Sequence, residues 1–419
     1  MSFRKLAATV GAALIVVGAC TGSSGAGNGK GTVKIGVDLP LSGGEVANGE
    51  PTFNGVQLAV DEANAANAAG GYKLEINKQD DAKDGVHNPD QGATNAKTLV
   101  ADAAVVGMVG PFNSNVARAI IPVTNEAGLA QCSPANTGVD LTKTGSEKYR
   151  PKNPNQRNYF RVATPDDVQG PAGAQYAFND LGKKKAYVLD DTEAFGKGVA
   201  DTFQAEFERL GGTVVKRDGA PKSTTDYTPF FTAVKGQVDV VYFGGTQVTG
   251  GGLARKQMVA AGMGDIPYVG PDGIADLGEG GAQGAFITLA GVDASNNVHG
   301  TVAGIHDIPD PAAFAAKYKA KFNKDPGAYS ALAYACTQVL IKAIASAATA
   351  PDQAAIRKAV RDYVFTTTNK FDTVLGTISF DENGDSSQKF ISFYKVDPAG
   401  AGGKGNWVFV KQQDFATTQ

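Results

Sequence analysis

The stretch that decides the fold is residues 32–66, "TVKIGVDLPLSGGEVANGEPTFNGVQLAVDEANAA". It opens with a short β-rich run, "TVKIGVDLP", and passes through a Gly-rich segment. Apolar residues then recur at helical spacing, namely Phe53, Val56, Val60 and Ala63. A strand followed by an amphipathic helix is typical of a parallel sheet with helices on its faces.

The same alternation continues along the chain. The strand-like runs "YKLEINKQ", "AVVGMVGP" and "LAQCSPA" are separated by the helical patterns "QGATNAKTLVADA" and "NVARAIIPVTNEAG". A polar segment at 144–158 interrupts this rhythm, and a second set then runs from "YFRVATP" to "IPYVGPDG". Two successive sets predict an α/β fold with two doubly wound lobes. Near the C-terminus, "GTISFDENGDSSQKFISFYKV" indicates a hairpin around Asn383-Gly384.

The N-terminus has the layout of a secretory signal. A short positive segment, "MSFRK", precedes the apolar run "LAATVGAALIVV", which is too short for a comfortable membrane span of about 20 residues. Gly18 and Ala19 precede Cys20, an arrangement that resembles a bacterial lipoprotein signal with a lipidated cysteine. We therefore expect a signal peptide at 1–19 and a lipidated flexible tether at 20–31, the alternative being an ordinary signal with an incidental cysteine.

Composition narrows the class of protein. The chain has 419 residues, of which 42% are apolar and 19% charged, so a globular protein is expected. The net charge is −3 and basic residues do not cluster, which excludes a nucleic-acid surface. No P-loop and no G-x-S-x-G motif occur, and none of the three histidines has zinc-protease spacing. We expect a monomer with no catalytic site, no metal and no cofactor.

Cys132 and Cys336 both stand in apolar contexts, "LAQCSPA" and "LAYACTQVL". Buried free thiols are the commoner outcome in such surroundings. A disulfide between them is the alternative for an exported protein.

Ligands of doubly wound sheets bind beyond the carboxyl ends of the strands. At the exit "GPFNSN", Asn113 or Ser114 is expected to cap the next helix, whose N-terminus favours an anion such as a carboxylate. At "SPANTG", Thr137 and the amides from Ala135 onward offer further donors. Plain helix capping is the alternative for each site.

Asp272 is a carboxylate at the exit of the run "IPYVGP". Pro271 before it and Gly273 after it constrain its local geometry. A lone buried carboxylate is costly, so in a crevice it requires a cation, which a ligand ammonium would supply. An anion site and a facing carboxylate suit a zwitterion such as an amino acid, the alternative being that Asp272 is only a turn residue.

Nearly the whole mature chain resembles the leucine/isoleucine/valine-binding family of ABC-transporter substrate-binding proteins. The resemblance rests on stretches in the family's order, including "VKIGVDLPLSGG", "VGPFNSNVA", "DDTEAFGKGVADTF", "YVGPDGIAD" and "GTISFDENGD". It implies a periplasmic binding protein type I fold with two lobes joined by a three-crossover hinge. Lobe one would comprise 32–160 and 291–372, and lobe two 161–290 and 373–419.

The resemblance also implies roles for individual residues. Ser114 and the stretch from Ala135 to Thr137 match the residues that hold the ligand carboxylate, and Asp272 matches the acidic partner of the ammonium. Phe195 and Tyr329 match aromatic walls. The implied partner is a membrane permease of an ABC transporter, with an amino acid or related amide as ligand.

This sequence departs from the family at several positions. Asn48 and Gln247 stand where aromatic residues are common, and Asp272 is one methylene shorter than the usual Glu. Both cysteines of the disulfide found in better-known members are missing. We therefore expect the zwitterion site with a more polar side-chain pocket.

Two alternatives to a transport protein stay open. One is a ligand-binding sensor or receptor component on the same fold. The other is an exported enzyme that uses Asp190, Asp191 or Glu193 with Asp272 as an acid/base pair.

Overall fold

The structure is a computed structural model that describes residues 30–416. The expected signal peptide, Cys20 and all but the last two residues of the expected tether lie outside the described residues.

Lobe one is built on a parallel five-stranded sheet of order β2-β1-β5-β6-β7. Its strands are β1 (Thr32–Leu39), β2 (Lys73–Asp80), β5 (Val105–Val109), β6 (Gln131–Ser133) and β7 (Tyr159–Arg161). A short ribbon of β3 (Ala82–Lys83) and β4 (Val86–His87) follows β2. The expected strand–helix alternation of this part of the chain is confirmed.

Helices cover both faces of this sheet. One face carries α2 (Pro89–Ala101) and α3 (Ser114–Glu126), whose residues Leu99, Val116 and Ile120 pack with Val105 and Met108 of β5. The other face carries α1 (Val46–Ala65), α10 (Ser330–Ser346) and α11 (Gln353–Val364), with α9 (Pro311–Phe322) beside α1. Helix α10 is buried on most of its surface, because it lies between the sheet and the helices α1 and α11.

Lobe two is built on a seven-stranded sheet of order β16-β15-β12-β11-β10-β8-β9. Its parallel strands are β8 (Lys185–Asp190), β9 (Thr213–Gly219), β10 (Val240–Gly244), β11 (Tyr268–Gly270) and β12 (Val298–Val302). Strands β15 (Phe390–Asp397) and β16 (Asn406–Asp414) complete the sheet in antiparallel pairing. Its helices are α4 (Asp166–Gln175), α5 (Ala194–Arg209), α6 (Thr228–Thr232), α7 (Gly252–Met258), α8 (Phe286–Ala290) and α12 (Gly400–Gly403).

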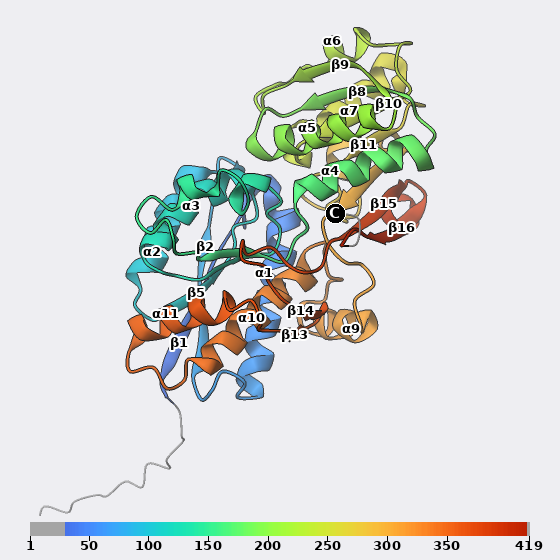
Figure 1. Cartoon of the computed structure of the whole chain (residues 1–419). Coiled ribbons are helices and arrows are strands. Elements are labelled where there is room, and N and C mark those ends of the chain that lie inside the picture. The colour runs from blue at the N-terminus through green and yellow to red at the C-terminus, as the bar shows by residue number, and fades with distance from the viewer. Residues whose placement is uncertain (1–29, 417–419) are drawn as a thin grey trace, which may run out of the picture.

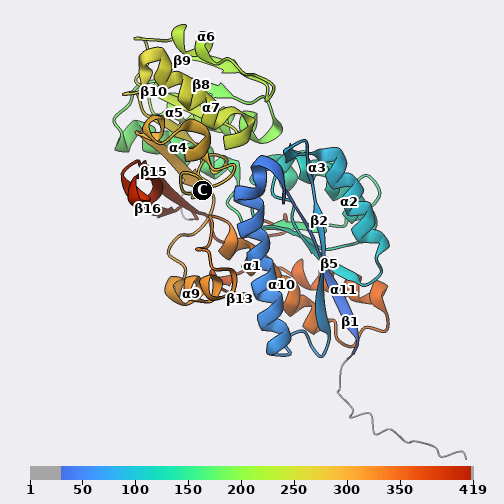
Figure 2. The same cartoon turned by 180° about the vertical axis from the view of Figure 1, so that it is seen from behind.

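The chain passes between the lobes three times within the described residues. It runs through lobe one in blue and teal and through lobe two in green and yellow, as Figure 1 shows. It returns to lobe one in orange as α9, α10 and α11, and ends in lobe two as the red strands β15 and β16. The crossovers are 162–165, 303–310 and 379–389. The view from behind shows the same two lobes joined by these crossovers (Figure 2).

The strand pairings correct two expected boundaries between the lobes. Residues 376–378 were expected in lobe two, but they pair with residues 371–373 of lobe one, so the third crossover begins after residue 378 rather than at 373. Strand β12 lies in the range 291–372 expected for lobe one, but it pairs with β11 and β15 of lobe two. The second crossover therefore follows Val302 rather than residue 290. Val298 and Val302 are buried, which explains why β12 belongs to the sheet of lobe two.

The expected hairpin around Asn383-Gly384 is present only close to the turn. Phe380 and Ser386 form an antiparallel bridge, and the amides of Asp381 and Ser387 donate hydrogen bonds to the carbonyls of Asp385 and Ser379. The longer arms expected for the hairpin pair elsewhere: β14 (Gly376–Ile378) pairs with β13 (Phe371–Thr373), and β15 pairs with β12 and β16. Phe380 packs on Phe160 in lobe one, so this short hairpin lies at the start of the crossover to lobe two.

Cys132 and Cys336 form a disulfide, which corrects the expectation of free thiols. Their Cα atoms are 5.7 Å apart although 204 positions separate them in sequence. Cys132 lies on β6 and Cys336 on α10, which the fold stacks against each other. Apolar surroundings in the sequence indicated burial correctly but carried no information on this long-range contact.

Candidate functional site

A small cavity lies between the lobes, at the carboxyl ends of strands from both sheets. Lobe one contributes Phe112, Asn113, Ser114, Ala135 and Thr137, and lobe two contributes Phe195, Thr246, Asp272 and Gly273. Six of the nine residues predicted to bind a ligand are therefore brought together here: Asn113, Ser114, Ala135, Thr137, Phe195 and Asp272. Residues of both predicted charge sites therefore line the same cavity.

The lobe-one wall is the N-terminus of α3 and the loop after β6. Asn113 occupies the N-cap position, but its side chain makes no capping hydrogen bond, contrary to expectation, and its buried Oδ1 has no partner. The hydroxyl of Ser114 accepts a hydrogen bond from the amide of Gly138 at 3.2 Å, which ties the two loops together. The first amides of α3 and its positive dipole end lie at this wall and favour an anion.

Arg161 supports this wall from behind. The side chain is fully buried and donates hydrogen bonds to the carbonyls of Asn136 at 3.3 Å and Gly138 at 2.7 Å. Its Nε also pairs with Asp385 of the third crossover at 2.7 Å. Sequence analysis missed Arg161, although a cation inside the apolar run "YFRVATP" was the signal that could have indicated a structural role.

Asp272 forms the opposite pole of the cavity and is 5% exposed. Its Oδ1 accepts a hydrogen bond from Nε2 of Gln169 at 2.9 Å, and its Oδ2 accepts one from the hydroxyl of Tyr329. Burial raises the pKa of Asp272 to about 6, although these hydrogen bonds lower it. Among residues 30–416, the hydrogen-bond partners of Asp272 are Gln169 and Tyr329, and neither is a cation, so these contacts do not neutralise its charge.

Gln169 on α4 connects Asp272 to a second buried carboxyl. Its Nε2 also lies 3.2 Å from Oδ1 of Asp166, and its Oε1 accepts a hydrogen bond from the hydroxyl of Thr301 at 3.1 Å. Burial, followed by the nearby charge of Asp272, raises the pKa of Asp166 to about 8. Asp166 therefore keeps its proton at neutral pH while Asp272 is ionised. Sequence analysis missed this pair, although "TPDDVQG" follows a strand as the other site loops do.

Three predicted residues do not line the cavity. Tyr329 lies behind Asp272, with its ring edge-on to Phe112 at a centroid distance of 5.1 Å. It therefore supports the carboxylate rather than forming a wall. Asn48 and Gln247 hydrogen-bond to each other across the two lobes at 3.4 Å.

The remaining wall of the cavity is largely apolar. Phe195 lines it as expected, and Phe112, which sequence analysis did not select, lies on the other lobe. Phe112 directly precedes Asn113 in "GPFNSN", so its position was available as a signal. Because Asn48 and Gln247 lie outside, the side-chain pocket is less polar than expected.

The carboxylates of "VLDDTEAFG" do not form an acid/base pair in the cavity. Asp190 pairs with Arg217 at 2.6 Å, and Asp191 accepts a hydrogen bond from the hydroxyl of Thr249 at 2.6 Å. Neither residue lines the cavity. These contacts hold lobe two together and give the enzyme alternative no support.

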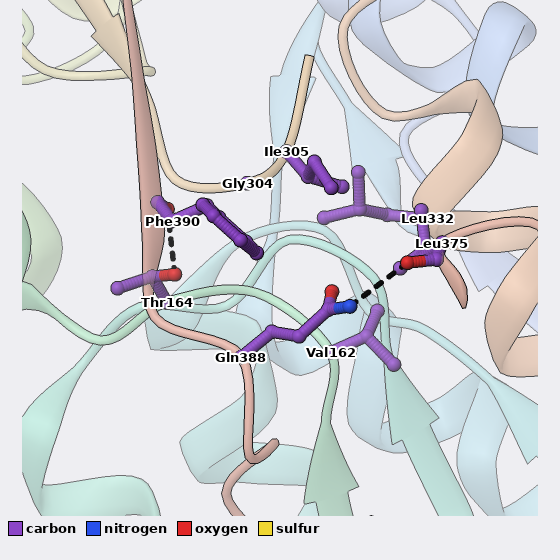
Figure 3. Close-up of a pocket in the computed structure, with 8 residues that line it drawn as sticks. All are labelled: Val162, Thr164, Gly304, Ile305, Leu332, Leu375, Gln388 and Phe390. Atoms are coloured by element: carbon purple, nitrogen blue, oxygen red, sulfur yellow. Dashed lines mark hydrogen bonds between the residues drawn. The ribbon is translucent and has the colours of Figure 1, made fainter. Parts of the chain in front are cut away.

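A second small pocket lies where the three crossovers meet (Figure 3). Gln388 donates a hydrogen bond to the carbonyl of Leu375 at 2.8 Å, and Thr164 donates one to the carbonyl of Phe390 at 2.8 Å. The remaining lining residues are Val162, Gly304, Ile305 and Leu332. Five of its eight lining residues belong to the three crossovers, and no charged residue lines it.

Within residues 30–416, no group of acidic, histidine and cysteine side chains is arranged to hold a metal ion. Over the same residues, no helix has the length and apolar character needed to span a bilayer.

A two-lobed α/β fold with a small polar-ended cavity between its lobes defines a solute-binding protein. Residues 32–404 match the periplasmic binding protein family, and the chain belongs to that family. Members of this class are substrate-binding components of ABC transporters rather than enzymes.

Named relatives agree with this assignment. The Leu/Ile/Val-binding protein BraC3 of Rhizobium johnstonii is 32% identical over 369 residues, which cover 87% of this chain and 91% of that protein. The leucine-binding protein LivK of Thermotoga maritima has a TM-score of 0.75 at 26% identity, covering 91% of this chain and 98% of its own. LivJ of Streptococcus pneumoniae, solved with isoleucine, has a TM-score of 0.72 at 25% identity, covering 90% and 100%.

Proposed function

We propose that this protein captures a free amino acid and delivers it to the permease of an ABC importer. The ligand carboxylate binds at the lobe-one wall around Asn113, Ser114 and the loop from Ala135 to Thr137. The ligand ammonium binds Asp272 on lobe two. The observation that carries the proposal is Asp272 itself, which is buried, hydrogen-bonds to no cation among residues 30–416 and shares one cavity with the N-terminus of α3.

Charge selects a zwitterion over a simple acid. A carboxylate without an ammonium would meet the dipole of α3 but would also face the ionised Asp272 across a small space. An amine without a carboxylate would leave the lobe-one donors unpaired. A ligand with both groups satisfies both lobes and thereby favours their closed arrangement.

The walls favour an apolar side chain on that amino acid. Phe112 and Phe195 supply aromatic surface from the two lobes. The names of the relatives, Leu/Ile/Val-binding and leucine-binding proteins, support aliphatic amino acids as the first candidates.

A thermal-shift panel tests the ligand class. The panel contains the common amino acids, small amides, and two analogues of leucine, 4-methylpentanoate without the ammonium and 3-methylbutylamine without the carboxylate. At 100-fold excess over its Kd a true ligand stabilises the fold by about 2.7 kcal/mol. We expect one or a few amino acids to raise the melting temperature and both analogues to leave it unchanged. No shift from any amino acid, or an equal shift from the acid alone, would contradict the proposal.

We further propose that the protein is anchored to the outer face of the cytoplasmic membrane through a lipid on Cys20. The sequence pattern before Cys20 and the Gly/Ser-rich segment after it support this. Cys20→Ala should move the protein from the membrane fraction of cells to the soluble exported fraction. Retention of the variant in the membrane fraction would contradict the anchor.

A further inference from the structure

His87 on β4 contacts a carboxylate from each lobe. Its Nδ1 lies 2.8 Å from Oε1 of Glu45, which ends the 3₁₀ turn η1 (Gly43–Glu45) of lobe one. Its Nε2 lies 2.8 Å from Oε2 of Glu193, the N-cap residue of α5 in lobe two. The imidazole is 2% exposed; its contact with Glu45 is buried, and its contact with Glu193 is partly buried. None of these three residues lines the ligand cavity.

The geometry itself fixes the charge of the ring. An ionised carboxylate only accepts hydrogen bonds, and a neutral imidazole has a single N–H, so contacts with two ionised carboxylates require the imidazolium form. Burial alone would lower the pKa of His87, but the charges and hydrogen bonds of Glu45 and Glu193 override it and raise the pKa to about 10. The positive ring thus joins two negative groups that belong to different lobes.

The surrounding groups reinforce this arrangement. Asp81 and Asp191 are the other carboxyls that interact with the charge of His87. Lys222 pairs with the second oxygen of Glu193 at 3.0 Å, and Asn115 of lobe one donates a hydrogen bond to Oε2 of Glu193 at 2.9 Å. Glu193 therefore receives donors from both lobes.

We propose that Glu45, His87 and Glu193 form an interlobe clasp, in which the His87 imidazolium holds the two lobes together in the closed state. Glu45 orients the ring within lobe one, and Glu193 supplies the contact that is made only when the lobes meet. The clasp is separate from the ligand cavity, so it sets how readily the lobes part whatever the ligand is.

The clasp makes closure depend on pH in a defined direction. In the open state His87 loses Glu193, and its pKa moves toward the ordinary value of about 6.5. Its contribution to closure is therefore complete below about pH 6.5 and is lost as the pH rises through about 10. Burial would raise the pKa of Glu193, but His87 and then Lys222 lower it to about 2, so its contribution is present above about pH 4.5 and is lost below that.

Histidine-ring NMR on the ligand-free protein tests the clasp. The chain has only three histidines, so His299→Gln and His306→Gln assign the third signal by elimination, even if His87→Gln fails to fold. We expect the His87 ring to titrate above about pH 8 in the natural protein. Glu193→Gln should lower that midpoint by at least about one unit, a tenfold change in proton affinity. Glu208→Gln, at an exposed position on the same helix, is the matched control and should not change it.

Small-angle scattering of the same variants at pH 6 tests whether the contact between His87 and Glu193 keeps the two lobes together. Glu193→Gln should increase the radius of gyration relative to Glu208→Gln. A midpoint at or below about 6.5 in the natural protein, a midpoint that Glu193→Gln leaves in place, or an unchanged radius of gyration would each overturn the clasp. Because neither readout needs a ligand, failure of the amino-acid proposal would leave this test intact.

Discussion

The protein orients the carboxylate of Asp272 by hydrogen bonds but leaves its charge without a cationic partner among residues 30–416. Gln169 and Tyr329 each donate one hydrogen bond to it, which fixes the orientation of the carboxylate without neutralising its charge. Each carboxylate oxygen can accept a further hydrogen bond, so both can still receive an ammonium donor. The neighbouring Asp166 holds its proton at neutral pH, which limits the repulsion at the site.

This chemistry predicts how ligand affinity depends on pH. Burial raises the pKa of Asp272 to about 6, and an ammonium binds only the ionised form. Between pH 7.5 and about 6 this group should leave the affinity nearly constant, and below that the affinity should fall by up to about tenfold per pH unit. Isothermal titration calorimetry from pH 7.5 to 5 measures the profile.

Asp272→Asn is the control for that profile, because the amide does not titrate. The residual affinity of this variant should be flat over the same range. A natural protein whose affinity stays constant down to pH 5 would contradict the role given to Asp272.

Residues that line the cavity were predicted from the sequence more successfully than the residues that support them through hydrogen bonds. Asn113, Ser114, Thr137 and Asp272 stand at strand exits, where chain direction alone places them. Gln169 and Arg161 act through contacts with residues more than 20 positions away, which no local pattern records. Asn48 and Gln247 were assigned to the pocket by resemblance, but their side chains are turned toward each other.

Among the elements, β6 and α10 are the pair that the disulfide joins. Cys132 directly precedes Ser133, whose hydroxyl orders the start of the ligand loop by accepting a hydrogen bond from the amide of Asn136 at 2.9 Å. Helix α10 begins next to Tyr329, the residue that supports Asp272. The crosslink therefore fixes the loop of the carboxylate site relative to a residue of the ammonium site.

Removal of the crosslink should lower stability. In Cys132→Ala/Cys336→Ala, we expect the free energy of unfolding to fall by about 2–5 kcal/mol, mainly because the unfolded chain gains freedom. Urea denaturation followed by circular dichroism measures the change. Thiol titration of the unfolded natural protein should detect these two cysteines only after reduction. Their reaction before reduction, or an unchanged urea midpoint in the variant, would contradict a structural disulfide.

The elements that the sequence predicted correctly are those whose pairing follows chain order. Each βα unit places its strand beside a neighbour through a helix, so periodicity was sufficient. The hairpin was predicted too long, because β15 pairs with β12, 90 to 96 positions earlier, and not with β14. Asn383 and Gly384 do form a turn, but this turn lies within the third crossover.

For the whole molecule, the central feature is that two lobes share one ligand cavity and three crossovers. The fully buried pair Arg161–Asp385 fastens the third crossover to the end of β7, and Arg161 also holds the carboxylate loop. Closure therefore brings Asp272 against a wall that is anchored at the hinge itself. A zwitterion completes this arrangement because its two charges contact different lobes.

The most direct test is calorimetric titration of the amino acid found in the ligand panel into the natural protein, Asp272→Asn and Asp265→Asn. Asp265 is an exposed carboxylate near the opposite end of β11, so its variant is a matched control. We predict that Asp272→Asn weakens binding by about 2–5 kcal/mol, because the ligand ammonium loses its charged partner. Asp265→Asn should bind as the natural protein does. Equal affinity in all three proteins would contradict the account.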